Sequence, residues 1–184
     1  MTAMADYTDT LGLIAGVRER RPVRSLPALD ALFRRLAICA RMEDAIATED
    51  RIWDLWMYHP HRAAAEALEA ATGDIAARRY DIAETRLARL LRGAPQFAEA
   101  WNKRAALYYL LGRDDDAIHD LHRTLELEPR HFGAILHVAE ILLGTGDREG
   151  ACFAFASALA LHPYLERARE AVAAQGPKSG KDPG

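Results

Sequence analysis

Three prolines stand at equal distances along the second half of the chain. Pro95, Pro129 and Pro163 follow one another at intervals of 34 residues. Because the proline ring blocks continuation of a helix, each of them is suited to end one helix and begin the next unit. A fixed period of this length is typical of proteins that stack small helical units in a row. The spacing therefore predicts successive units of equal length.

Other positions keep the same period. Small residues recur at two places in each unit, in the sets Ala71, Ala105, Ala139 and Ala83, Ala117, Ala151, while large apolar residues recur at Leu87, Leu121 and Phe155. In a close antiparallel pair of helices, only small side chains fit where the two backbones approach, and larger ones fill the space between pairs. Gly112 and Gly146 supply the freedom to adopt positive φ that the turn within a pair requires. The pattern predicts two helices per unit.

The stretch 98–129 resembles a tetratricopeptide repeat almost column by column. The matching residues are Trp101, Ala105, Tyr108, Gly112, Ala117, Leu121, Thr124 and Pro129. The next unit matches through Val138, Ala139, Gly146, Ala151, Phe155, Ala158 and Pro163. Arg104 departs from the usual leucine, and in the preceding unit Arg78 replaces the turn glycine. The good match covers about half of the chain.

The resemblance implies an all-α fold, a right-handed superhelical solenoid of antiparallel helix pairs. We expect three repeat units, at 64–97, 98–131 and 132–163. Apolar stripes in residues 26–63 predict a divergent helical pair that caps the solenoid, and residues 164–175 predict a C-terminal capping helix. Residues 1–25 are expected to form a flexible leader and residues 176–184 a disordered tail.

In this family the first helices of successive units line a concave groove that holds a peptide or helix of a partner. The resemblance places ten groove residues on three helices here: Leu68, Thr72, Ile75, Glu99, Asn102, Tyr109, Leu136, His137, Glu140 and Leu143. Apolar residues outnumber charged ones in this set, which suits an amphipathic helix better than a highly charged peptide. The alternative is that segments of the same chain cover some of these residues.

Some family members bind the C-terminal carboxylate of a partner through lysine, asparagine and arginine on this face. The corresponding places carry Leu68 and Thr72, then Lys103, then Gly133 and His137. Since most of the required cations and amides are missing, the sequence argues against a C-terminal chaperone peptide as the ligand.

Charge and motifs exclude several other classes. The net charge of −3 and the pI near 6.2 give no overall attraction to nucleic acid. Cys39 and Cys152 define neither a disulfide framework nor a metal motif. His119 and His122 lie one helical turn apart, but further ligands at suitable spacing are missing, so we expect solvated histidines and no metal. We find no catalytic motif, expect no cofactor and no enzymatic activity, and predict a cytoplasmic protein without a membrane span.

The leader leaves alternatives open. Leu11, Leu13, Ile14 and Val17 precede a run of arginines, namely Arg18, Arg20, Arg21 and Arg24. A short amphipathic helix made of this stretch could contact a partner, an acidic membrane or the protein's own groove. We favour a solvated, flexible arm.

The leading hypothesis is therefore a non-catalytic protein-interaction module, such as an adaptor, co-chaperone or assembly factor, that binds another protein in its groove. The alternative is a self-associating scaffold protein. Trp53 and Trp56 motivate this alternative, because two large aromatic side chains near the end of a solenoid could be incompletely covered and form a homo-oligomeric contact.

Overall fold

A computed structural model describes residues 3–24 and 26–174 of the chain, with side chains from Tyr7 onward. Within these residues the fold consists of ten α-helices and no β-strand, as the sequence predicted. The helices are α1 (Ala3–Ala15), α2 (Pro27–Ile38), α3 (Met42–Met57), α4 (Arg62–Ala76), α5 (Tyr80–Gly93), α6 (Ala98–Leu110), α7 (Asp114–Leu127), α8 (Phe132–Thr145), α9 (Arg148–Leu161) and α10 (Glu166–Ala174).

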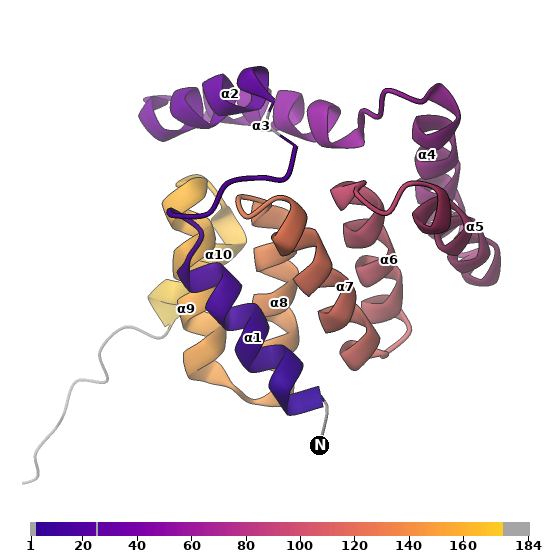
Figure 1. Ribbon diagram of the computed structural model, residues 1–184. Helices are drawn as coiled ribbons and strands as arrows, with labels where there is room; N and C mark the ends of the chain where they lie inside the picture. The colour runs from indigo at the N-terminus through magenta and orange to yellow at the C-terminus, as the bar shows by residue number, and fades with distance from the viewer. Residues whose placement is uncertain (1–2, 25, 175–184) are drawn as a thin grey trace, which may run out of the picture.

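Three antiparallel pairs form the body of the molecule. The pairs α4–α5, α6–α7 and α8–α9 stand side by side in chain order (Figure 1). The repeated alanines and the large residues Leu87, Leu121 and Phe155 are all buried, which is consistent with close packing within and between the pairs. The sequence period therefore corresponds to one helix pair per unit.

The turn within each pair has the same backbone conformation at the same place in the period. Gly112 has φ 69° and Gly146 has φ 90°, as expected for glycine at the end of a helix. Arg78, which occupies the equivalent position of the first unit, has φ 57°. A non-glycine residue is strained there, so the packing of the pair imposes the left-handed turn even where the side chain opposes it.

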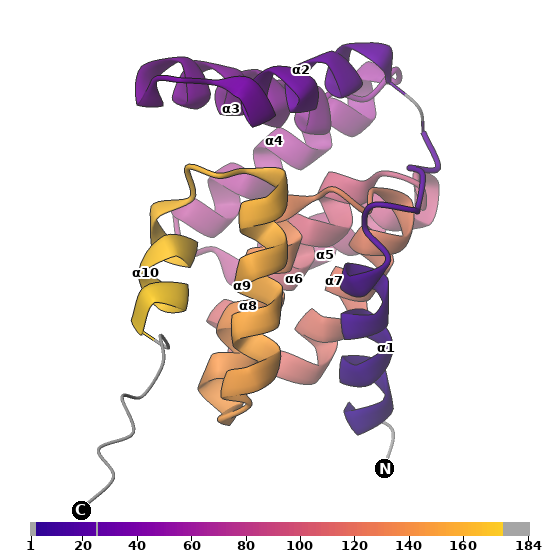
Figure 2. The same ribbon diagram turned by 90° about the vertical axis from the view of Figure 1, so that its left-hand side faces the viewer.

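The leader is not a flexible arm over the residues that the structure describes. Helix α1 packs against α7 and α9, which are second helices of their pairs, and Ile14 and Val17 are buried there. Past the helix, the main-chain N–H of Val23 donates a hydrogen bond of 2.9 Å to the carbonyl of Leu127. Figure 2 shows α1 and α10 on opposite sides of the α8–α9 pair. The leader therefore lies on the outer face and does not occupy the groove.

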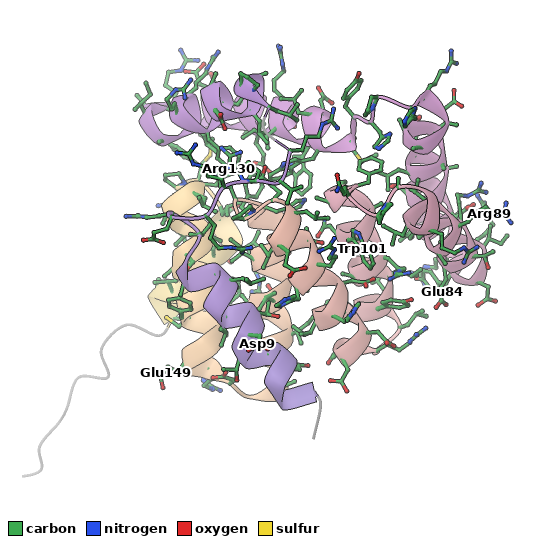
Figure 3. All side chains as sticks on the ribbon, viewed as in Figure 1. Asp9, Glu84, Arg89, Trp101, Arg130 and Glu149 are labelled. Carbon is green, nitrogen blue, oxygen red and sulfur yellow. The ribbon has the colours of Figure 1, made fainter. Side chains whose placement is uncertain are left out.

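Helices α2 and α3 do not continue the row of pairs. They lie across the ends of the repeat helices, at a large angle to them (Figure 1). Arg130, in the turn between α7 and α8, reaches up to this layer and donates to Asp30 at 2.7 Å (Figure 3). On the far side, His162 lies 2.9 Å from Glu49, and the hydroxyl of Tyr164 donates to the carbonyl of Cys39. The helical pair therefore covers an edge of the solenoid, where we expected it to cap its first unit.

The C-terminal helix α10 packs against α9 and buries Ala168. Its Arg167 forms a two-pronged ion pair with Glu140 of α8, at 2.7 and 3.0 Å. Helix α10 thus covers the last pair on the side away from α1. The expected tail at residues 176–184 lies outside the described residues.

Candidate functional site

The ten groove residues that the sequence predicts all belong to the first helices α4, α6 and α8, whose common side we call the inner face. Neighbouring first helices contact each other directly. The structure separates the ten residues into three groups with different exposure. One group is buried in or against the core, one is sealed beneath α3, and one is open.

On α4 the predicted residues belong mainly to the core. Leu68 is 0% exposed and packs in a cluster with Ala71 and Leu87. The hydroxyl of Thr72 donates to the carbonyl of Leu68 at 3.0 Å, and Ile75 packs against the same cluster. Leu68 is therefore removed from the surface that a partner can reach, which corrects its place in the predicted groove.

Helix α3 seals the part of the inner face where α6 and α8 begin. The indole of Trp53 packs edge-on against Phe132 and His131. Nζ of Lys103 lies over the Trp53 ring, 5.6 Å from its centroid. A β-carbon built on Gly133 would lie only 2.6 Å from Cη2 of Trp53. Gly133 and Lys103 are the places where family members contact a partner's carboxylate, and here a side chain of the same molecule occupies them.

Under this cover lies a buried polar network around Glu99. Its Oε2 accepts hydrogen bonds from His131 at 2.7 Å and from Asn102 at 3.1 Å, and its Oε1 pairs with Nζ of Lys103 at 3.1 Å. Burial opposes ionisation of Glu99, but the hydrogen bond from His131 and the charge of Lys103 outweigh it, so the pKa of Glu99 is lowered. The network therefore holds a carboxylate in the interior.

The ring of His131 has a defined tautomer. Its Nδ1 accepts a hydrogen bond from the main-chain N–H of Ala134 at 3.1 Å, which caps the start of α8. Nε2 must then carry the proton that points at Glu99. The ring also stacks on Trp56, with ring centres 4.0 Å apart. His131 thus joins α3, α6 and α8 at one point.

His137 lies one turn further along α8 and is also enclosed. Burial lowers the pKa of His137 to about 4. Its Nδ1 and Oδ1 of Asn102 have no hydrogen-bond partner among the described residues. Buried polar atoms without partners are costly, and a neutral imidazole of this kind does not offer a charge to a ligand. His137 and Asn102 therefore belong to the sealed part of the inner face.

The open part of the inner face lies at the other end of the first helices. Tyr109 on α6 is 39% exposed, and Glu140 on α8 is paired with Arg167 of α10. The pair and, to a smaller extent, the nearby phenol of Tyr109 raise the pKa of Arg167. Leu136 and Leu143 are half-buried and pack against the core. The sequence missed Arg167, because the family pattern ends before α10.

The two tryptophans that suggested self-association are covered. Trp56 is buried, and Trp53 donates from Nε1 to Glu49 at 3.1 Å while packing on Phe132. Trp56 is an interior residue and Trp53 a half-buried one at the junction between α3 and the repeats, so they do not form the exposed aromatic surface that motivated a homo-oligomeric contact. His119 and His122 pair with acidic neighbours and, in the described part of the chain, belong to no group of residues that could hold a metal ion.

The geometry defines a class, a helical-repeat protein whose antiparallel pairs stack through small residues. The family model of the tetratricopeptide repeat matches residues 98–131. A TPR repeat-containing protein of Rhizobium etli is 36% identical over 78 residues, which are 42% of this chain and 38% of that protein. Residues 98–131 therefore form a tetratricopeptide repeat, and the chain is similar to a protein that contains such repeats. The part of this chain that matches the Rhizobium etli protein spans well under half of that protein's length.

Among solved structures, a mutant of MamA is similar in fold. The TM-score is 0.51 at 20% sequence identity, and the match covers 80% of this chain and 83% of that one. At this identity the likeness concerns the fold alone. The tetratricopeptide repeat itself supports a protein-interaction or scaffold module. In the described residues, no helix has the length and apolarity that crossing a membrane requires.

Proposed function

We propose that this chain is a non-catalytic interaction module that holds a peptide or amphipathic helix of another protein on the open part of its inner face. The observation that carries the proposal is the exposed ring of Tyr109 beside the Glu140–Arg167 pair. An aromatic side chain supplies apolar contact area at low conformational cost, and the adjacent ion pair offers both charges at the rim. This combination suits a partner segment with one apolar face and polar edges.

The location differs from the one that the family pattern favours. Trp53 packs beside Lys103 and against Gly133, and this argues against a partner carboxylate at that end of the face. A bound segment would instead contact the ends of α6 and α8 that lie far from α3. Tyr109, Glu140 and Leu143 remain candidate partner contacts, while Leu68, Glu99, Asn102 and His137 have structural roles.

A pair of matched substitutions tests the proposal. Tyr109→Glu should abolish capture of the partner, whereas Phe153→Glu on α9 should leave capture intact, because Phe153 has a similar exposure of 42% but lies on a second helix. A photo-crosslinking amino acid placed at each position should label the partner only from position 109. Both variants should retain helical circular dichroism. Equal capture by the two variants, or equal labelling from the two positions, would mean that the partner does not bind at the open part of the inner face.

A further inference from the structure

The outward side of the α2–α3 layer carries an apolar groove. The groove has a volume of about 680 Å³ and is lined by Ala28, Ala31, Leu32, Arg35, Arg51, Asp54 and Leu55. A second hollow of about 320 Å³ shares Leu32, Arg35 and Arg51 and extends to Ala47 and Thr48. The two hollows together follow the line along which α2 and α3 meet.

The composition of this groove is unusual for the outer side of a two-helix layer. The buried residues of α2 and α3, such as Leu29, Leu36, Ile52 and Trp56, already anchor the layer to the body. A helix with one buried face usually has a polar opposite face. Here three alanines and two leucines lie on the groove side, and α2 and α3 form the outermost layer, with no other described helix above them (Figure 1). The groove therefore has the small and apolar residues that let another helix approach closely.

The side chains that the two hollows share include two positively charged ones. Arg35 and Arg51 line both hollows, and neither forms an ion pair with a described residue. By contrast, Arg41 at the turn between the helices pairs with Glu43 and Asp44. Asp54 contributes to the larger hollow only. Two unpaired guanidinium groups beside an apolar groove are complementary to carboxylates on a guest.

From these observations we infer that the α2–α3 groove binds an amphipathic helix of a protein partner, a helix with an apolar stripe flanked by glutamate or aspartate. The apolar stripe lies on Ala28, Ala31 and Leu32, and the acidic residues face Arg35 and Arg51. This surface lies on the opposite side of α3 from the sealed residues of the inner face. It is a second binding surface, distinct from the one proposed around Tyr109, and it allows the chain to hold two proteins at once.

The test uses the full chain and two synthetic peptides of about 16 residues, the length of helix that α3 itself could lie beside. Both peptides carry leucine at helical spacing, and one has glutamates where the other has lysines. Fluorescence anisotropy should give binding that is about tenfold tighter for the glutamate peptide. Arg35→Glu combined with Arg51→Glu should reverse the preference, and Arg169→Glu on α10 should leave it unchanged.

A second experiment fills the groove with a larger side chain. Ala31→Phe fills the groove and should weaken binding of the glutamate peptide at least about tenfold. Two controls, Ala70→Phe on an exposed side of α4 and Tyr109→Glu, should leave this affinity unchanged. Equal affinity for the two peptides, or unchanged binding by Ala31→Phe, would overturn the inference. So would either of two other results: attachment to phosphatidylserine vesicles without peptide binding, or a dimer in light scattering that Ala31→Phe dissolves.

Discussion

The Nε2 atom of His131 lies 2.7 Å from Oε2 of Glu99, and both side chains are completely buried. Glu99 begins α6 and His131 precedes α8, so the bond links two consecutive units at the edge that α2 and α3 cover. Removing a hydrogen-bond donor from a buried carboxylate leaves one of its oxygens unsatisfied, and this costs more than the hydrogen bond contributed. The junction should therefore be sensitive to His131.

His131→Ala should lower the free energy of unfolding by about 3 kcal/mol. The buried carboxylate of Glu99 loses a hydrogen-bond donor, and α8 loses its cap. His119→Ala is the control, since His119 is exposed and its neighbour Asp120 also binds Arg104. It should change stability by less than about 0.5 kcal/mol. Urea denaturation followed by circular dichroism measures both. Similar values for the two variants would contradict a structural role of the Glu99–His131 bond.

Gly133 and Gly144 form an informative pair, because both lie in α8 but differ in surroundings. A β-carbon on Gly133 would collide with Trp53, whose indole is held by Phe132 and Glu49. We expect Gly133→Ala to destabilise the protein by about 1–3 kcal/mol through overpacking. Gly144→Ala meets no atom within 4 Å and should stabilise it by up to about 1 kcal/mol through helix propensity.

Thermal and urea unfolding measure the two glycine variants. In a Trp53→Leu background, the cost of Gly133→Ala should largely disappear, because the colliding ring is gone. If Gly133→Ala stabilised the chain as much as Gly144→Ala, α3 would not press on α8 in solution. The sealed end of the inner face would then be accessible, and a carboxylate-binding partner would have to be reconsidered.

The period of the sequence was enough to predict the helix pairs, because each repeated residue has a local steric reason. Small residues are required where helices cross, and the turn requires a residue with a left-handed backbone conformation. These positions are therefore recognisable in a single sequence. Arg104 departs from the pattern, and its partner lies on the other helix of the same unit. It is held by Asp120 through two hydrogen bonds of 2.6 and 2.9 Å, and its guanidinium lies over Trp101.

The positions of α1 and of the α2–α3 layer could not be predicted in the same way. Contacts such as Arg130 with Asp30 and Thr10 with His122 join residues about a hundred positions apart and recur in no period. The family pattern gives the inner face of an isolated row of pairs, and a non-repeating segment then decides which part stays open. Glu99, Asn102 and His137 are enclosed where α3 adjoins the repeats, whereas Leu68 is buried in the core cluster of its own helix pair.

Ile14 tests the position of the leader. The side chain is 1% exposed and lies in the main core cluster, so Ile14→Ala should lower the free energy of unfolding by about 2–4 kcal/mol. Asp9→Ala, an exposed change on the same helix, should have an effect below about 0.5 kcal/mol. Denaturant titration distinguishes them. A negligible effect of Ile14→Ala would restore the flexible arm that the sequence suggested.

His137 predicts how stability depends on pH. Burial holds its pKa at about 4 in the folded chain, against 6.5 for the free side chain, so the unfolded state binds a proton first on acidification. Stability must therefore fall as the pH drops from 6.5 towards 4, by at most about 1.4 kcal/mol per pH unit from this group. The carboxyl groups Glu49 and Glu99 have lowered pKa values, so their contribution is retained above about pH 4.5 and is lost only below it.

Because burial also lowers the pKa of His59, the contribution of His137 is obtained by comparing variants in urea denaturation between about pH 7 and pH 5. His137→Gln should flatten the loss of stability over this range, because the variant has no group that must be charged on unfolding. His119→Gln removes an exposed histidine instead and should keep the slope of the original chain. The charged groups near His137 are Glu99, Lys103 and Glu140, and these groups and the neighbouring ring of His131 remain in both variants. If His137→Gln kept the same slope as His119→Gln, the imidazole would be open to solvent, and the inner face would be less sealed at that point than the contacts of Trp53 indicate.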